Sequence, residues 1–174
     1  MLSTVGFWDS FYAQKSSQRA EDKEWYLPST TAAATVRAFV GAWERGPSPP
    51  PLRVLHNGCG TSPLGELIRR DPLVGSVVDA DFSPVATTQL DDADSAADGG
   101  EGGRVVVTCD ARDMRAVFAD GAFDVVVGKG LVDAATAASE ARAATAAALA
   151  REAARVLAAG GCWLEFSTLS LIHI

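Results

Sequence analysis

Three short segments of this chain carry residues whose types and spacing suit the binding of a nucleoside. From Gly58 to Ser62 a Gly-x-Gly turn joins a short apolar run to a helix that Ser62 and Pro63 begin. Glycines there let the backbone turn sharply, and we expect the amides that open the helix to face a ligand. Asp81 follows a second apolar run, where a carboxylate can accept hydrogen bonds from both hydroxyls of a ribose.

The residues near Asp81 bear on which nucleoside would be held. Asp79 points to the same side of the predicted strand and is the competing ribose ligand. Asp110 follows a third apolar run and can accept from the exocyclic amine of adenine, and Phe82 can pack on the base. Pro63 stands where the dinucleotide fingerprint has its third glycine, and no Gly-Lys-Ser or Gly-Lys-Thr follows, which disfavours NAD and a P-loop. The pattern predicts a ribose-bearing ligand with little or no phosphate.

The segments that must position these residues alternate between strand and helix patterns. Apolar or β-branched runs predict strands at residues 52–56, 74–80, 104–108, 122–127 and 162–166. Helical patterns separate most of them, and two more precede the first strand, one of them with Phe7, Trp8, Phe11 and Tyr12 on one face. This order predicts a parallel α/β sheet with helices on both faces. Its ligand should lie beyond the carboxyl ends of the strands, on one rim shared by Gly58 to Ser62, Asp81, Asp110 and Gly128 to Gly130.

The length and composition bound the organisation of the chain. With 174 residues we expect a single domain, in which residues 1–51 are an N-terminal helical segment and a proline-rich connector, and residues 52–174 bind the ligand. Residues 91–103 are acidic and rich in glycine, with too little apolar surface to pack, and predict a flexible loop.

Charge and cysteine content exclude several classes of function. The net charge of −7 disfavours tight binding to nucleic acid. Three isolated cysteines and two distant histidines predict reduced thiols and no metal site. We see neither a signal peptide nor a run long enough to span a bilayer, and therefore expect a cytoplasmic protein without a membrane partner.

Five segments, in this order, resemble the successive motifs of class I S-adenosylmethionine-dependent methyltransferases: VLHNGCGTS, VVDADFSPV, CDARDM, FDVVVGKGLVDA and ARVLAAGGCWLEFS. More narrowly, they are similar to the methyltransferase 13-like family, which includes lysine methyltransferases acting on elongation factor 1A. The aromatic start from Phe7 to Tyr12 and the Trp25-Tyr26 pair match that family too. The resemblance implies a Rossmann-like three-layer sandwich with a largely parallel sheet, here lacking the last two strands.

The resemblance also implies roles for individual residues. Gly58, Cys59 and Gly60 would cradle the methionine part of S-adenosyl-L-methionine, Asp81 would hold the ribose, and Asp110 with Ala111 would border the adenine. The implied cofactor-binding residues are Trp8, Gly58, Cys59, Gly60, Asp81, Phe82, Asp110, Ala111 and Gly128. Trp8 and Tyr12 would belong to an N-terminal lid over the site.

The catalytic candidates follow from the same resemblance. Lys129 and Asp133 match the segment that the family places near the reacting methyl group. An acceptor lysine must lose a proton before it attacks, and Tyr12, Tyr26 and Asp133 are the candidates to assist. The partner would be a protein substrate with a lysine acceptor, an elongation factor being one example.

The chain departs from the family pattern after the fourth predicted strand. Gly128 stands where the family usually has an acid, Leu131 where it has threonine, and Thr61 where it has asparagine. The predicted function is an S-adenosylmethionine-dependent methyltransferase of a protein lysine. Two alternatives stay open: a truncated or degenerate module that binds the cofactor without catalysis, and a methyltransferase of small molecules.

Overall fold

A computed structural model describes residues 4–15, 24–43, 50–96, 104–137 and 141–168 of the chain. The five strands in this part of the chain are β1 (Leu52–Asn57), β2 (Val74–Asp81), β3 (Arg104–Thr108), β4 (Phe123–Lys129) and β5 (Leu157–Phe166). They form one sheet in the order β3-β2-β1-β4-β5, and every neighbouring pair is parallel. The predicted α/β class with a parallel sheet is confirmed.

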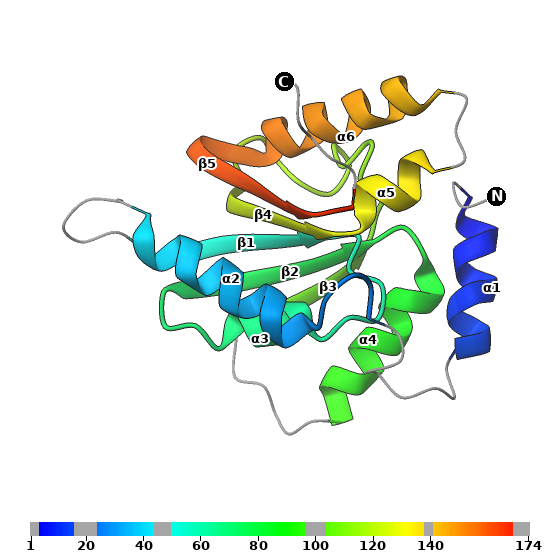
Figure 1. The fold of residues 1–174 in the computed structure, drawn as a ribbon, viewed down its shortest axis with the longest axis horizontal. Coiled ribbons are helices and arrows are strands. Elements are labelled where there is room, and N and C mark those ends of the chain that lie inside the picture. The colour runs from blue at the N-terminus through cyan, green and yellow to red at the C-terminus, as the bar shows by residue number, and fades with distance from the viewer. Residues whose placement is uncertain (1–3, 16–23, 44–49, 97–103, 138–140, 169–174) are drawn as a thin grey trace.

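Helices cover both faces of this sheet (Figure 1). The helices are α1 (Val5–Lys15), α2 (Ser29–Ala42), α3 (Leu64–Arg69), α4 (Pro84–Ala96), α5 (Leu131–Thr136) and α6 (Arg142–Val156). On one face, apolar side chains of α2 and α3 pack with Val54, Val77 and Val125 of the strands. On the other face, Val156 of α6 packs with Leu55. Two apolar cores therefore enclose the sheet, which gives the three layers of the predicted sandwich.

The first helix lies beside the carboxyl ends of the strands, against α4. Its Asp9 accepts a hydrogen bond of 2.5 Å from the Ser83 hydroxyl, and its Tyr12 carbonyl accepts one of 3.2 Å from Gln89. Trp8 and Tyr12 are buried on its inner side. The aromatic face predicted for this segment is thus turned toward the rest of the protein.

Two predicted boundaries are wrong. The predicted loop at 91–103 begins too early, because α4 continues to Ala96; alanine favours the helix there, and Asp91 and Asp92 point to solvent at no cost in packing. Residues 97–103 lie outside the described part. The last strand begins at Leu157 instead of Cys162, because Gly160, at a φ of 81°, sits inside the strand opposite a register shift in β4.

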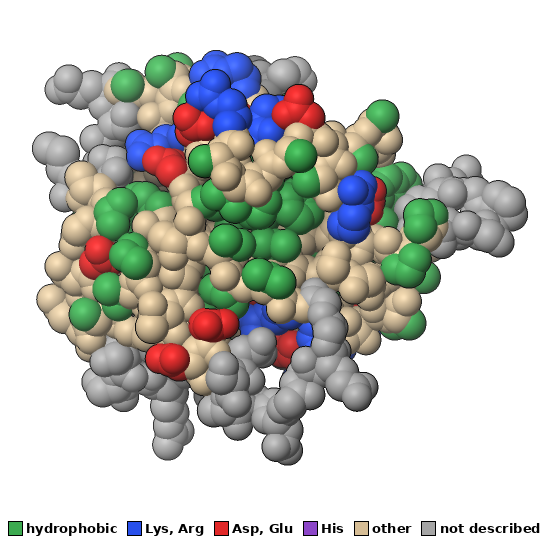
Figure 2. All heavy atoms as spheres, turned by 180° about the vertical axis from the view of Figure 1, so that it is seen from behind, with side chains coloured by type: hydrophobic (Ala, Val, Ile, Leu, Met, Phe, Trp, Pro, Cys, Tyr) green, Lys and Arg blue, Asp and Glu red, His purple; other side chains and the backbone are tan. Residues whose placement is uncertain are grey.

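The rear surface carries acidic and basic side chains close together (Figure 2). Hydrophobic side chains gather at the centre of that face, with both signs of charge above them. That face therefore offers no uniformly basic surface for the phosphates of a nucleic acid. Within the described residues, no helix combines the length and the apolar character needed to span a bilayer.

Candidate functional site

The carboxyl ends of the strands surround a cavity of about 890 Å³, part of it open to solvent. The lining comes from Trp8 and Tyr12 of α1, from Trp25, from residues 56–62, 81–82, 109–112 and 129–131, and from Ala134, Ala135 and Leu149. The rim predicted from the strand ends is therefore present, except that Gly128 does not line the cavity.

The loop after β1 requires glycine at two positions. Gly58 and Gly60 have φ angles of 69° and 53°, a region that side chains disfavour. A Cβ on Gly58 would also lie 2.9 Å from the Leu131 side chain, and one on Gly60 would overlap the Tyr12 hydroxyl. The close approach of α1 and α5 to this loop thus depends on both glycines.

Backbone amides of the loop after β1 are turned toward the protein. The N–H groups of Gly58 and Cys59 donate to the Ala80 carbonyl, at 2.8 and 3.0 Å, and that of Gly60 donates to Asp81. The Leu64 amide, which opens α3, donates to the Ser62 hydroxyl. The sequence indicates the turn but not the direction of its N–H groups, which the neighbouring strand β2 takes up.

Asp81 reaches the cavity and Asp79 does not. One Asp81 oxygen accepts from the Gly60 amide and the other from the Ser83 amide, both at 2.9 Å. Each oxygen keeps a lone pair, so the carboxylate can still accept from ribose hydroxyls. Burial raises the pKa of Asp81, and the two amide donors partly offset this. The Asp79 side chain is fully buried outside the lining, and its oxygens bind His56 and Arg104.

The segment after β3 forms the side of the cavity predicted for adenine. Cys109, Asp110 and Ala111 line it together with Phe82. The Asp110 carboxylate is held by the Arg112 guanidinium at 2.6 to 3.1 Å. Burial raises the pKa of Asp110, but the hydrogen bonds from Arg112 outweigh it and leave this pKa below its usual range. An adenine amine would therefore share this carboxylate with Arg112.

Of the four candidates for catalysis, Lys129 and Tyr12 line the cavity, and Asp133 and Tyr26 do not. Lys129 lines it and forms a buried ion pair with Glu24. Tyr12 lines it too, and burial raises the pKa of its hydroxyl well above the ordinary value, so this group stays protonated at neutral pH. Asp133 is outside the lining, because its carboxylate accepts two hydrogen bonds from Thr168.

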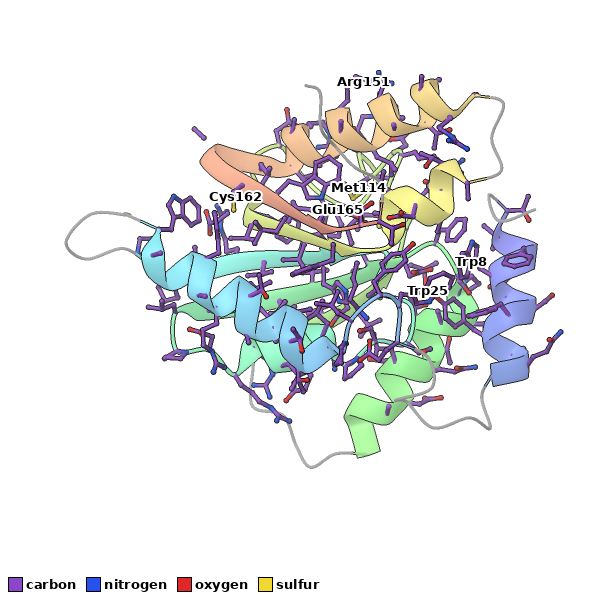
Figure 3. The ribbon with its side chains drawn as sticks, in the orientation of Figure 1. Trp8, Trp25, Met114, Arg151, Cys162 and Glu165 are labelled. Atoms are coloured by element: carbon purple, nitrogen blue, oxygen red, sulfur yellow. The ribbon has the colours of Figure 1, made fainter. Side chains whose placement is uncertain are left out.

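A carboxylate occupies the space beside Gly128 even though residue 128 has none. Glu165 of β5 lies opposite Gly128 in the parallel register, and a Cβ built on this glycine would overlap its carboxylate. The Glu165 side chain extends from β5 (Figure 3). Its carboxylate accepts from the Val132 amide at 3.2 Å, and burial raises the pKa of Glu165 to about 7. Sequence reasoning missed Glu165, because the pairing of β4 with β5 decides which residue faces position 128.

The comparisons with known proteins agree with this geometry. Residues 55–164 match the family model described as "Methyltransferase domain". The chain belongs to this family. It is 28% identical to the citrate synthase-lysine N-methyltransferase of Danio rerio over 172 residues, covering 95% of this chain and 67% of that protein. The Homo sapiens protein of the same name is also 28% identical, with 92% and 68% covered.

Solved structures show the same fold at low identity. A putative S-adenosyl-L-methionine-dependent methyltransferase of Methanococcus maripaludis superposes with a TM-score of 0.65 at 16% identity, over 92% of this chain and 62% of that one. A putative methyltransferase of Haloferax volcanii, in complex with the activator Trm112, gives 0.59 at 20% identity, over 90% and 57%. The chain thus spans less than two thirds of these two solved proteins. It is a class I methyltransferase domain, and its cofactor is S-adenosyl-L-methionine.

The residues present fit this cofactor. Asp81 has spare acceptor positions for a ribose, and Phe82, Ala111 and Leu131 give apolar walls for a base. In the described part of the chain, no group of three or more His, Cys, Asp or Glu side chains is placed to hold a metal ion. The assignment of single residues to ribose, adenine and methionine stays a prediction.

Proposed function

We propose that this protein methylates the side-chain amine of a lysine in another protein. The observation that carries the proposal is the extent of the similarity to the citrate synthase-lysine N-methyltransferases. It covers 95% of this chain, whereas the methyltransferase domain model begins at residue 55. The similarity therefore includes the N-terminal segment whose aromatic side chains line the cavity.

When bound, the cofactor would supply a methyl group on a sulfonium: the N–C bond to the lysine would form as the carbon–sulfur bond breaks, with a neutral thioether as the leaving group. The chain contributes position and exclusion of water. Asp81 and the glycine loop hold the ligand, and the buried Trp8 and Tyr12 close one side of the cavity.

The acceptor must lose a proton, since the pKa of a free lysine is about 10.4. Among the described residues that line the cavity, the acidic ones are Asp81 and Asp110, and both already accept hydrogen bonds from the protein. Tyr12 stays protonated. Desolvation of the amine once it passes the aromatic wall into the cavity disfavours its charged form, and this contributes most to its deprotonation.

The test offers two protein acceptors to the purified chain with methyl-tritiated S-adenosylmethionine. Citrate synthase is chosen from the relatives and elongation factor 1A from the sequence motifs. We expect label in a lysine of one of them, and none with an Asp81→Ala variant whose circular dichroism matches the wild type. If the wild type does not bind S-adenosylhomocysteine in calorimetry, the proposal is refuted.

A second candidate is a module that binds the cofactor without catalysis, which the lack of an acidic side chain at residue 128 favours. It predicts binding of S-adenosylhomocysteine and no transfer to protein or to small molecules. Label that appears only in a soluble product would instead indicate a small-molecule methyltransferase. The cytoplasmic location stays a proposal too, since the relatives are named mitochondrial; fractionation of cells that express the tagged protein tests it.

A further inference from the structure

Residues 24–29, here called the strap, cross the carboxyl end of β4 and are tied to the rim of the cavity. Glu24 forms the buried ion pair with Lys129 and accepts a hydrogen bond of 2.9 Å from the Ser29 amide. The Ser29 hydroxyl is 2.8 Å from that of Ser62, in the loop after β1. The strap is therefore fixed to β4 and to the glycine loop at once.

The middle of the strap adopts a conformation that a side chain disfavours. Tyr26 has a φ of 63°, and the Leu27 amide donates to the Trp25 carbonyl at 2.7 Å, so the turn closes over three residues. The Tyr26 ring packs against Gly130, where an added Cβ would lie 3.1 Å from it. Such backbone persists only where surrounding contacts hold it, and it concentrates at functional sites.

This turn presents the Trp25 side chain to the cavity. Trp25 lines the cavity with 36% of its surface exposed, whereas Trp8 and Tyr12 behind it are 6% and 9% exposed. The rings of Trp25 and Trp8 are 5.8 Å apart and tilted by 55° (Figure 3). Trp25 is thus the outermost ring of an aromatic wall.

The strand order places Trp25 away from the side predicted for adenosine. Asp81 and Asp110 follow β2 and β3, on one side of β1, and the strap lies over β4 on the other side. A cofactor with its adenosine at β2 and β3 and its methionine at the loop after β1 would turn its methyl group toward β4. An acceptor would then enter beside Trp25.

The charges around the cavity decide how an amine can be received there. Asp81 is bound by two backbone amides, Asp110 by Arg112, and Lys129 by Glu24. An incoming lysine therefore meets aromatic rings instead of a free carboxylate. A ring face attracts a cation, and its edge and face pack against the methylene groups of a lysine stem.

We propose that Trp25 is the specificity-determining residue for the acceptor: its indole binds the aliphatic stem and the ammonium end of a lysine side chain. The proposal rests on the proposed lysine acceptor. On this proposal, the strap makes the protein prefer acceptors with a long alkylamine over acceptors that carry a carboxylate or a short hydroxyl group.

The first experiment uses a probe that needs no catalysis. The indole N–H signals of the full chain, loaded with S-adenosylhomocysteine, are followed by NMR during titration with butylammonium chloride, and a Trp25→Phe variant identifies the Trp25 signal. We expect this signal to move with saturation while that of Trp43, which follows α2 and is outside the cavity lining, stays in place. A smaller shift with 1-butanol is expected. No movement at Trp25, or equal movement at both tryptophans, would overturn the assignment.

The second experiment separates recognition from folding and from cofactor binding. With citrate synthase as acceptor, Trp25→Ala should raise KM at least tenfold and Trp25→Phe less than threefold. The calorimetric Kd for S-adenosylhomocysteine should stay within twofold in both. Phe39→Ala is the matched control, because Phe39 is 38% exposed on α2, outside the cavity lining.

The outcomes distinguish this inference from the proposed function. If citrate synthase is not labelled, the proposed acceptor fails and the NMR titration still decides the role of Trp25. If it is labelled but Trp25→Ala leaves KM unchanged, only the role of Trp25 is refuted. A rise of more than fivefold in the Kd for S-adenosylhomocysteine would make Trp25 a cofactor residue and would overturn the assignment.

Discussion

Glu165 fills the space that a side chain at residue 128 would need, so the carboxylate near this rim comes from β5. Only glycine at 128 leaves room for it. One oxygen accepts from the Val132 amide at the start of α5, and the other has no partner among the described residues. An unpaired buried oxygen favours the neutral acid, in agreement with the pKa of about 7. Glu165 thus holds the start of α5, a helix whose Leu131 and Ala134 line the cavity.

This raised pKa makes stability depend on pH. Between pH 4.5 and 7 the folded chain keeps a proton on Glu165 that the unfolded chain has lost, so the free energy of unfolding falls as pH rises through this window. A shift of this size corresponds to up to about 3 kcal/mol. Glu165→Gln should remove this loss and leave the variant more stable than the wild type at pH 8.

Urea unfolding at pH 5 and pH 8 measures the effect of Glu165→Gln. The glutamine keeps an oxygen for the Val132 amide, so packing is conserved. Asp91→Asn is the control, because Asp91 is exposed. Equal slopes with pH in wild type and Glu165→Gln would show that another group is responsible.

At the scale of elements, α3 packs against β2 through a glycine. A Cβ on Gly65 would overlap the carboxyl group of Asp79, which binds His56 at 2.6 Å and Arg104 at 2.7 Å. Asp79 and His56 are fully buried. The overlap would displace a buried polar group that has no solvent to move into. The close contact between helix and strand therefore depends on Gly65 as the dinucleotide fold depends on its third glycine.

Gly65→Ala should therefore destabilise the protein, by about 1–3 kcal/mol. Gly41→Ala is the matched control, since Gly41 lies in α2 with nothing within 4 Å of an added Cβ. That substitution should stabilise by about 0.5–1 kcal/mol, because alanine favours the helix. Urea midpoints report both changes, and a neutral or stabilising Gly65→Ala would show that Asp79 has another position available.

Features that depend on residues close together in the chain can be predicted from the sequence, whereas contacts between distant segments cannot. Strands, their parallel order and the rim of Gly58, Asp81 and Asp110 follow from apolar runs and turn residues. The Gly60 amide bonded to Asp81, and Glu165 beside Gly128, arise from pairing between strands distant in the chain. The sequence of a single segment does not indicate which distant residue it will contact. The sequence indicates the strap only through the Trp25-Tyr26 pair. Its ion pair is not predictable, because Glu24 and Lys129 are 105 residues apart.

At the scale of the whole molecule, the cavity joins parts that have few other contacts. The first helix packs mainly on α4, and the strap touches β4, the loop after β1 and Gly130. Both contribute walls of the cavity, together with the segments that follow the strands. A ligand in the cavity would therefore contact the N-terminal segment and the sheet simultaneously, and ligand binding should stabilise their mutual position.

Saturation with S-adenosylhomocysteine should then stabilise the molecule unevenly. At a concentration one hundred times the Kd, a ligand that binds only the folded state adds about 2.7 kcal/mol. This corresponds to a rise in Tm of about 5–10 °C for a chain of this size.

Hydrogen exchange followed by mass spectrometry should show the largest slowing in α1 and the strap, because their opening would break contacts with the ligand. The carboxyl-terminal part of α6 serves as the internal reference, since it packs on β5 away from the cavity. Equal slowing in α1, the strap and α6 would mean that the N-terminal segment does not close over the ligand, and the aromatic wall would then lose its role in excluding water.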